Sequence, residues 1–148
     1  MKNNLFVGLD LSLANTGVCV IDEEGNLFSA QSVQTGTIKG EVGGPPTEAP
    51  GNLTMKVCAE NVANNKVQCT GNIQLTESAY TKAYSLELPV GEYNVYSFDT
   101  QLPNDKIYYD KMVTCGFEYG CPNDIIAVKV LAGQTLENIN PTDWYTTH

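Results

Sequence analysis

The segment 84–98 constrains the fold of this chain most strongly. In 84–88, a tyrosine and two leucines alternate with a serine and a glutamate, which is the period of a half-buried strand. Pro89 has no N–H for a strand ladder and Gly91 tolerates a positive φ, so together they indicate a turn. Residues 92–98, which are rich in aromatic and β-branched side chains, predict a second strand. We therefore expect this segment to form a β-hairpin.

Short alternating segments separated by Gly or Pro continue through residues 36–148. Their number and spacing indicate a β-sandwich. We expect an all-β fold with negligible helix: a single β-sandwich of about seven strands over residues 36–148, preceded by an N-terminal β-meander over residues 1–35. The strands predicted for the sandwich are 37–42, 53–59, 67–75, 84–88, 92–98, 107–115 and 125–131.

Residues 1–35 are too apolar for a simple connector. Segments 5–12, 18–22 and 27–33 predict three antiparallel strands. An isolated hairpin is marginal in water, and the sandwich already has enough strands of its own. We therefore expect at least one strand within residues 5–21 to be buried against another element or a second copy of the chain. The candidate assembly residues are Leu5, Phe6, Val7, Leu9, Leu11, Val18, Val20 and Ile21.

The five cysteines predict two local disulfide bonds. No CxxC motif is present, which argues against redox and zinc-ribbon sites. A turn near residues 63–64 would place Cys58 opposite Cys69, and Cys115 and Cys121 would close a short loop. We expect these two bonds, with Cys19 unpaired. Such bonds favour an extracellular or cell-surface location, because they persist in oxidising compartments.

Charge and composition exclude several functions. The 148 residues carry a net charge of −9, and the single histidine is the last residue. The negative charge opposes nucleic-acid binding, and the shortage of histidine argues against His-based zinc sites and Ser-His-Asp catalysis. No apolar run is long enough for a membrane span. We expect no enzymatic activity, no cofactor and no metal site.

Several further groups of residues have both a functional and a structural interpretation. The acids at 22–24 could contribute to a Ca²⁺ site, but they lack the spacing of a calcium loop, so a solvated turn is the simpler interpretation. The acids at 99, 105 and 110 could converge at one end of the sandwich, and dispersed surface acids are the simpler interpretation there. The eight tyrosines could fill the core and its rim or form an exposed binding surface. Asn52, in the triplet 52–54, is a glycosylation acceptor by sequence.

Three motifs occur in an order that resembles the carboxypeptidase regulatory-like domain, a small transthyretin-like β-sandwich. They are GTIKGEV at 36–42, YSLELPVGEY at 84–93 and VKVLAGQTLENINPTDWY at 128–145. The resemblance covers about 110 residues. It implies a structural or binding module without catalytic residues, in which the Asp-Trp pair near the end of the third motif caps the sandwich.

The N-terminal stretch GLDLSLANTGVCVID at 8–22 is similar to the first hairpin of RuvC-type members of the RNase H-like superfamily. In that family an Asp on the first strand, which would be Asp10 here, binds a catalytic metal. The resemblance covers about 25 residues. The additional acids and helices that this chemistry needs do not follow it, which argues against an active nuclease.

The sequence thus favours a non-enzymatic extracellular β-sandwich with a structural or adhesive role, which polymerises when an N-terminal strand is added to the sheet of a neighbour. One alternative is a carbohydrate- or peptide-binding module that uses exposed tyrosines. Another is a RuvC-like metal-dependent nuclease fragment. The expected partners are further copies of the chain and a surface glycan or protein, with no nucleic acid and no membrane insertion.

Overall fold

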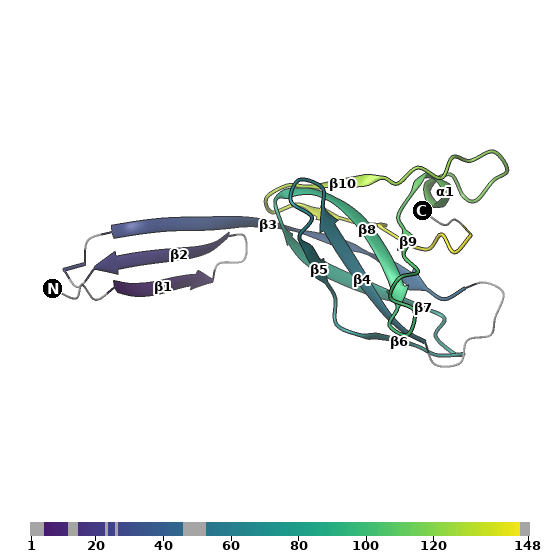
Figure 1. The fold of residues 1–148 in the computed structure, drawn as a ribbon, viewed down its shortest axis with the longest axis horizontal. Coiled ribbons are helices and arrows are strands. Elements are labelled where there is room, and N and C mark those ends of the chain that lie inside the picture. Colours follow the sequence, from purple (N-terminus) through teal and green to yellow (C-terminus); the bar gives the residue numbers. More distant parts are fainter. Residues whose placement is uncertain (1–4, 12–14, 23, 26, 46–52, 146–148) are drawn as a thin grey trace.

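The fold is known from a computed structural model, shown in Figure 1. Its regular structure is β-strand apart from one four-residue helix in the described residues, α1 (Lys111–Thr114), so the predicted all-β class is confirmed. The structure describes residues 5–11, 15–22, 24–25, 27–45 and 53–145, and among the first 32 residues it describes the side chains of 6, 7, 20–22, 24 and 25.

The strands form two sheets. The first sheet has the order β1-β2-β3-β11, and β7 also pairs with β3. Its strands are β1 (Leu5–Leu11), β2 (Asn15–Asp22), β3 (Leu27–Gly43), β7 (Thr81–Pro89) and β11 (Thr135–Leu136). The pairings are antiparallel except that of β11 with β3, which is parallel.

The second sheet has the order β10-β8-β4-β5, with β6 paired to β4 and β9 paired to β8. All of these pairings are antiparallel. Its strands are β4 (Leu53–Asn61), β5 (Val67–Cys69), β6 (Ile73–Leu75), β8 (Gly91–Asp99), β9 (Ile107–Tyr108) and β10 (Ala127–Val130).

The core lies between the second sheet and the C-terminal half of β3 with β7. Alternate residues of each strand enter it, as the period of two requires. We call this part of the chain, from residue 35 onward, the body. Its fully buried large apolar side chains come from β3, β4, β6, β7, β8 and β10: Ile38, Val42, Met55, Val57, Leu75, Leu88, Val95 and Val130.

β3 joins the body to a separate N-terminal sheet. The strand is 17 residues long; its residues 27–34 pair with β2, and its residues 35–43 pair with β7. Figure 1 shows β1, β2 and the start of β3 extending away from the body. The prediction of separate strands at 27–33 and 37–42 is wrong, because the chain stays extended through Gly36, which pairs with Leu88 of β7. A Cβ at Gly36 would collide with the Leu131 carbonyl oxygen, so the close approach of the two backbones requires glycine there.

The predicted hairpin at 84–98 is also wrong. β7 pairs with β3 in the first sheet, whereas β8 pairs with β4, β9 and β10 in the second. The turn at Pro89–Gly91 therefore connects the two sheets across the core. The alternation is the same in either arrangement, because both strands bury one face in the same core.

Two predicted strands are shorter than expected. The strand expected at 107–115 ends at Tyr108, because Asp110 begins α1 by accepting a hydrogen bond from the Val113 N–H at 3.1 Å. The strand expected at 67–75 is divided into β5 and β6. Between them the Thr70 N–H donates to the Val57 carbonyl, and the Thr70 hydroxyl accepts from the Val57 N–H.

Candidate assembly surface

The N-terminal sheet consists of β1, β2 and residues 27–34 of β3. In its register Phe6 lies opposite Ile21, and Val7 lies opposite Val20. Opposite residues of an antiparallel pair share a face, and successive residues point to opposite faces. Apolar side chains therefore lie on both faces of this sheet.

Three of the apolar side chains of this sheet are exposed to solvent. Phe6 is 55% exposed, Val7 is 67% exposed and Val33 of β3 is 40% exposed. Val33 lies opposite Thr16, which places it on the face of Val7 and Val20. Contacts within the sheet thus leave these three apolar side chains largely in water.

Both edges of the N-terminal sheet are open in the described part of the chain. β1 pairs with β2 alone, and residues 27–33 of β3 also pair with β2 alone. An open edge presents unpaired N–H and C=O groups, which can pair with another chain. The two edges differ in sequence and are therefore not equivalent.

The body holds the base of this sheet firmly. The Gln34 carbonyl accepts from the Val90 N–H at 2.9 Å, and the Thr35 carbonyl accepts from the Gly133 N–H at 2.8 Å. The Thr35 hydroxyl donates to Glu87 Oε1 at 2.7 Å. Continuous β3 hydrogen bonding therefore fixes the direction in which the N-terminal sheet leaves the body.

The structure describes the side chains of only some of the predicted assembly residues. Leu5, Leu9, Leu11 and Val18 lie on β1 and β2 as predicted, but their side chains are outside the described set. The same holds for Cys19 and Asp10, which pair in register with Gly8 and Gly17. The sequon residue Asn52 lies outside the described residues. Val33 was not predicted, although the alternation in 27–33 could have indicated it.

Both predicted disulfide bonds are present. Cys58 lies opposite Cys69 in the register of β4 and β5 and is bonded to it. Cys115 is bonded to Cys121 across the loop that follows α1. Cys58 lies off the core face, as expected, yet it is buried, and its register partner on β8 is the buried Tyr96. The outer face of the second sheet is thus partly covered by its own side chains.

An aromatic and charged cluster forms this cover. The Tyr96 and Tyr108 ring centroids lie 5.4 Å apart, and Lys106 Nζ lies 4.4 Å from the Tyr96 centroid and 3.6 Å from Glu60 Oε2. Burial raises the pKa of Tyr96. Burial alone would lower the pKa of Lys106, but the neighbouring tyrosines and Glu60 outweigh it, and the pKa is raised. The cluster therefore keeps its cation charged beside the rings at neutral pH.

The predicted acidic groups take separate places. Asp99 accepts from the Gln101 N–H at 3.0 Å, Asp110 caps α1, and Asp105 is exposed. Asp22 accepts from the Glu24 N–H at 3.0 Å in the turn before β3. Among the described residues, no three His, Cys, Asp or Glu side chains gather closely enough to hold a metal.

The described helix α1 is too short to cross a membrane.

The tyrosines are divided between the core and the surface. Tyr84 and Tyr93 are buried, and the Tyr84 hydroxyl donates to the Ile139 carbonyl at 2.6 Å. Burial raises the pKa of Tyr84. Tyr119 and Tyr145 are exposed. Trp144, of the Asp-Trp pair, packs against the core, and its indole N–H donates to the Gly43 carbonyl at 3.1 Å.

Comparisons with known proteins do not place the chain in a family. No protein-family description matches it, and no curated protein matches it. A solved structure, that of a leucine-rich repeat protein from Bacteroides thetaiotaomicron, aligns with 92% of this chain at 10% identity and a TM-score of 0.40. The chain spans 22% of that protein's length. A similarity of this size supports no inference about fold or function.

Proposed function

We propose that this chain is a non-enzymatic structural subunit of the cell surface or extracellular space, and that it self-associates into filaments through its N-terminal sheet. The observation that carries the proposal is a sheet with exposed apolar side chains on both faces and two open edges, held outside the body by one continuous strand.

The energetics favour a partner for this sheet. Burying a large apolar side chain is worth roughly 1.5–3 kcal/mol, and a small sheet without a core is only marginally stable in water. Phe6, Val7 and Val33 together offer several kcal/mol to any surface that covers them. A second copy of the same sheet offers a matching apolar face.

Stacking of two such sheets covers these faces, and the two edges of each sheet suggest how further copies join. When β1 of one copy pairs with residues 27–33 of β3 of the next, the contact is heterologous, because it joins unlike surfaces. Each added copy presents the same free edge again, so the contact repeats without closing. An open-ended filament is the expected product.

Two further observations support the location and the module type. The two disulfide bonds fit an oxidising compartment. The motifs at 36–42, 84–93 and 128–145 resemble the carboxypeptidase regulatory-like domain, whose members are commonly structural or binding units. We include both the extracellular location and this module type in the proposal.

The test replaces exposed apolar residues with charges. In the double variant Phe6→Lys and Val7→Lys, assembly of the full chain should be lost while the body stays folded, because both side chains are already exposed in the single chain. A matched control replaces Leu102 (56% exposed) and Val62 (48% exposed) on the body with lysine. Electron microscopy and light scattering of the three proteins measure assembly.

Wild type and control should form filaments, and the double variant should remain monomeric. A wild-type chain that stays monomeric at high concentration would refute the proposal. Deletion of residues 1–34 provides a second test and should leave a folded, soluble monomer, because the described core residues begin at Ile38. If the shortened chain cannot fold, the N-terminal strands belong to the body and the proposal fails.

A further inference from the structure

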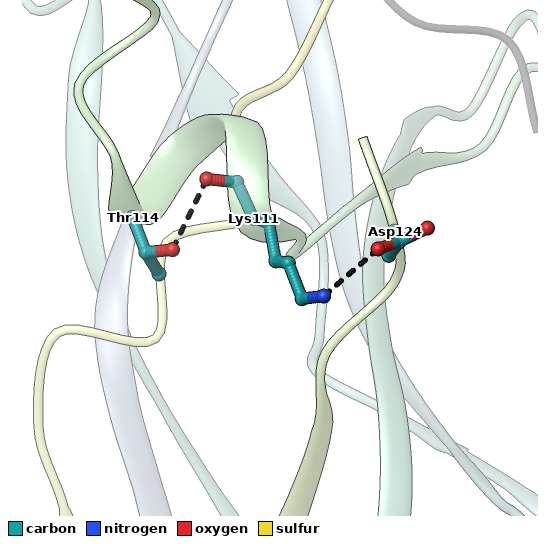
Figure 2. Close-up of polar contacts among 3 residues, drawn as sticks. All are labelled: Lys111, Thr114 and Asp124. Carbon is teal, nitrogen blue, oxygen red and sulfur yellow. Dashed lines mark hydrogen bonds and ion pairs between the residues drawn. The ribbon is translucent and has the colours of Figure 1, made fainter. Parts of the chain in front are cut away.

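The loop Cys115–Cys121 is braced at both of its ends. α1 precedes it, and the Lys111 ammonium binds Asp124 Oδ2 at 2.8 Å, as Figure 2 shows. The Lys111 N–H also donates to the Asp124 carbonyl at 3.0 Å, and a β-bridge joins Asp110 to Ile125. The disulfide bond closes the loop itself. A seven-residue loop at the surface is thus tied down by covalent, ionic and backbone contacts.

Phe117 in this loop has an unusual backbone. Its φ is +60°, in the left-handed region, which bulky residues rarely adopt. The other non-glycine residues with positive φ in the described structure are Asn65 and Asn138, and asparagine tolerates that region well. The Phe117 N–H donates to the Met112 carbonyl at 3.0 Å, which holds the strained conformation. Such strain is typical of functional sites.

The strained loop and Tyr145 expose aromatic rings to solvent. Phe117 is 44% exposed, Tyr145 is 68% exposed and Tyr119 is fully exposed. The rings of Phe117 and Tyr145 meet edge to face, with centroids 6.0 Å apart and planes at 71°. Phe117 and Tyr145 together form an apolar corner, and the exposed Glu118 follows Phe117 in the chain. We call this pair of aromatic side chains the aromatic corner.

We propose that the aromatic corner binds a neutral glycan. The C–H face of a sugar ring stacks on an aromatic face, and its hydroxyl groups can pair with a carboxylate and with tyrosine O–H groups. The patch consists of two aromatic side chains, which is far smaller than the roughly 800 Å² that a stable protein interface needs on each partner. The net charge of −9 and the adjacent Glu118 disfavour anionic glycans. This inference is independent of the self-association of the N-terminal sheet.

The single tryptophan offers a direct readout. Trp144 directly precedes Tyr145 in the chain, and the hydrogen bond from its indole N–H to the Gly43 carbonyl holds its side chain in place. We would titrate the full chain with soluble dextran, mannan, laminarin, xylan and hydroxyethylcellulose, and follow both Trp144 fluorescence and the heat of binding. Heparin is the anionic probe. At least one neutral polysaccharide should bind, and heparin should not.

The informative variant is Phe117→Gly, because glycine adopts a φ of +60° without strain. This variant should unfold at the same temperature as wild type or at a higher one. It should bind the glycan at least about tenfold more weakly, because one stacked ring is lost. Tyr145→Ala should also weaken binding. Leu102→Ala, an exposed apolar residue in another loop, should bind like wild type.

The outcomes separate a binding role from a structural one. If no neutral polysaccharide binds wild type, or if Phe117→Gly binds as well as wild type, the proposal is overturned. If Phe117→Gly lowers the unfolding temperature and leaves binding intact, Phe117 and Tyr145 are a structural pair. Binding of heparin alone would also contradict the assignment of a neutral ligand.

Discussion

The N-terminal sheet and the body are built from similar strands but bury their apolar side chains to different extents. In the body, the apolar faces of two sheets meet in one core, where Ile38, Val57 and Val95 are inaccessible to solvent. In the N-terminal sheet, Phe6 and Val7 remain exposed. The comparison shows that alternation makes a strand, whereas a core requires a second layer. The body supplies that layer itself, and we propose that a second copy supplies it for the N-terminal sheet.

The largest difference between the two regions should appear in their response to truncation of an apolar side chain. Leu88→Ala removes a fully buried side chain from the core and should lower the free energy of unfolding by about 2–5 kcal/mol. Val7→Ala removes one that is 67% exposed and should change it by less than about 0.5 kcal/mol in dilute solution. Urea unfolding of both variants measures this. Equal losses would mean that the N-terminal sheet is part of the same cooperative unit.

The next effect concerns the two disulfide bonds of the body. Replacing both Cys58 and Cys69 with alanine should lower the free energy of unfolding by about 3 kcal/mol, because the unfolded chain without the bond has more conformational entropy. Replacing Cys115 and Cys121 should cost slightly less, since their loop is shorter. Denaturant unfolding under non-reducing conditions tests both. No loss in either variant would show that the thiols are not bonded in solution.

A smaller effect is expected where the body is closed by its C-terminal segment. Tyr84→Phe removes the buried hydroxyl that donates to the Ile139 carbonyl at 2.6 Å and leaves that carbonyl without this partner. We expect a loss of about 1–2 kcal/mol in the free energy of unfolding. Tyr119→Phe, at a fully exposed position, is the matched control and should be neutral. A neutral Tyr84→Phe would mean that water replaces this contact.

The smallest effect is a pH dependence at the surface. The hydrogen bond and charge of Lys111 lower the pKa of Asp124 below its ordinary value of 3.8. A carboxylate with a lowered folded-state pKa stabilises the fold above its ordinary pKa, and this contribution is lost as the pH falls through the folded-state value. NMR titration should place the midpoint of Asp124 below 3.8 in wild type and close to it in Lys111→Met. An unshifted midpoint in wild type would mean that the ion pair does not form in solution.

Much of the local structure could be predicted from the sequence. Alternation identified most strands, and the turn after β4 led to the pairing of Cys58 with Cys69. Which strands pair with each other could not be predicted. β7 and β8 bury the same residues whether they pair with each other or with strands of separate sheets. The capped helix after Asp110 was readable in principle, because Asp is a favoured N-cap, but the apolar run from Ile107 suggested a strand.

The candidate sites were predictable to different degrees. The apolar N-terminal strands were evident from composition, and their projection from the body depends on the unbroken path of β3 through Gly36. The aromatic corner was not predictable, because it joins Phe117 to Tyr145, 28 positions later in the sequence, through folding of the C-terminal segment. The positive φ of Phe117 could not be predicted from the sequence either, because phenylalanine rarely adopts it.

The most direct test of the central claim is hydrogen exchange of the full chain at a series of protein concentrations, read separately for β1 with β2 and for β4 with β8. If a second copy stabilises the N-terminal sheet, amide protection in β1 and β2 should rise with concentration, while protection in β4 and β8 stays constant. Phe6→Lys with Val7→Lys should abolish the rise. Protection of β1 and β2 that is high and independent of concentration would contradict the account.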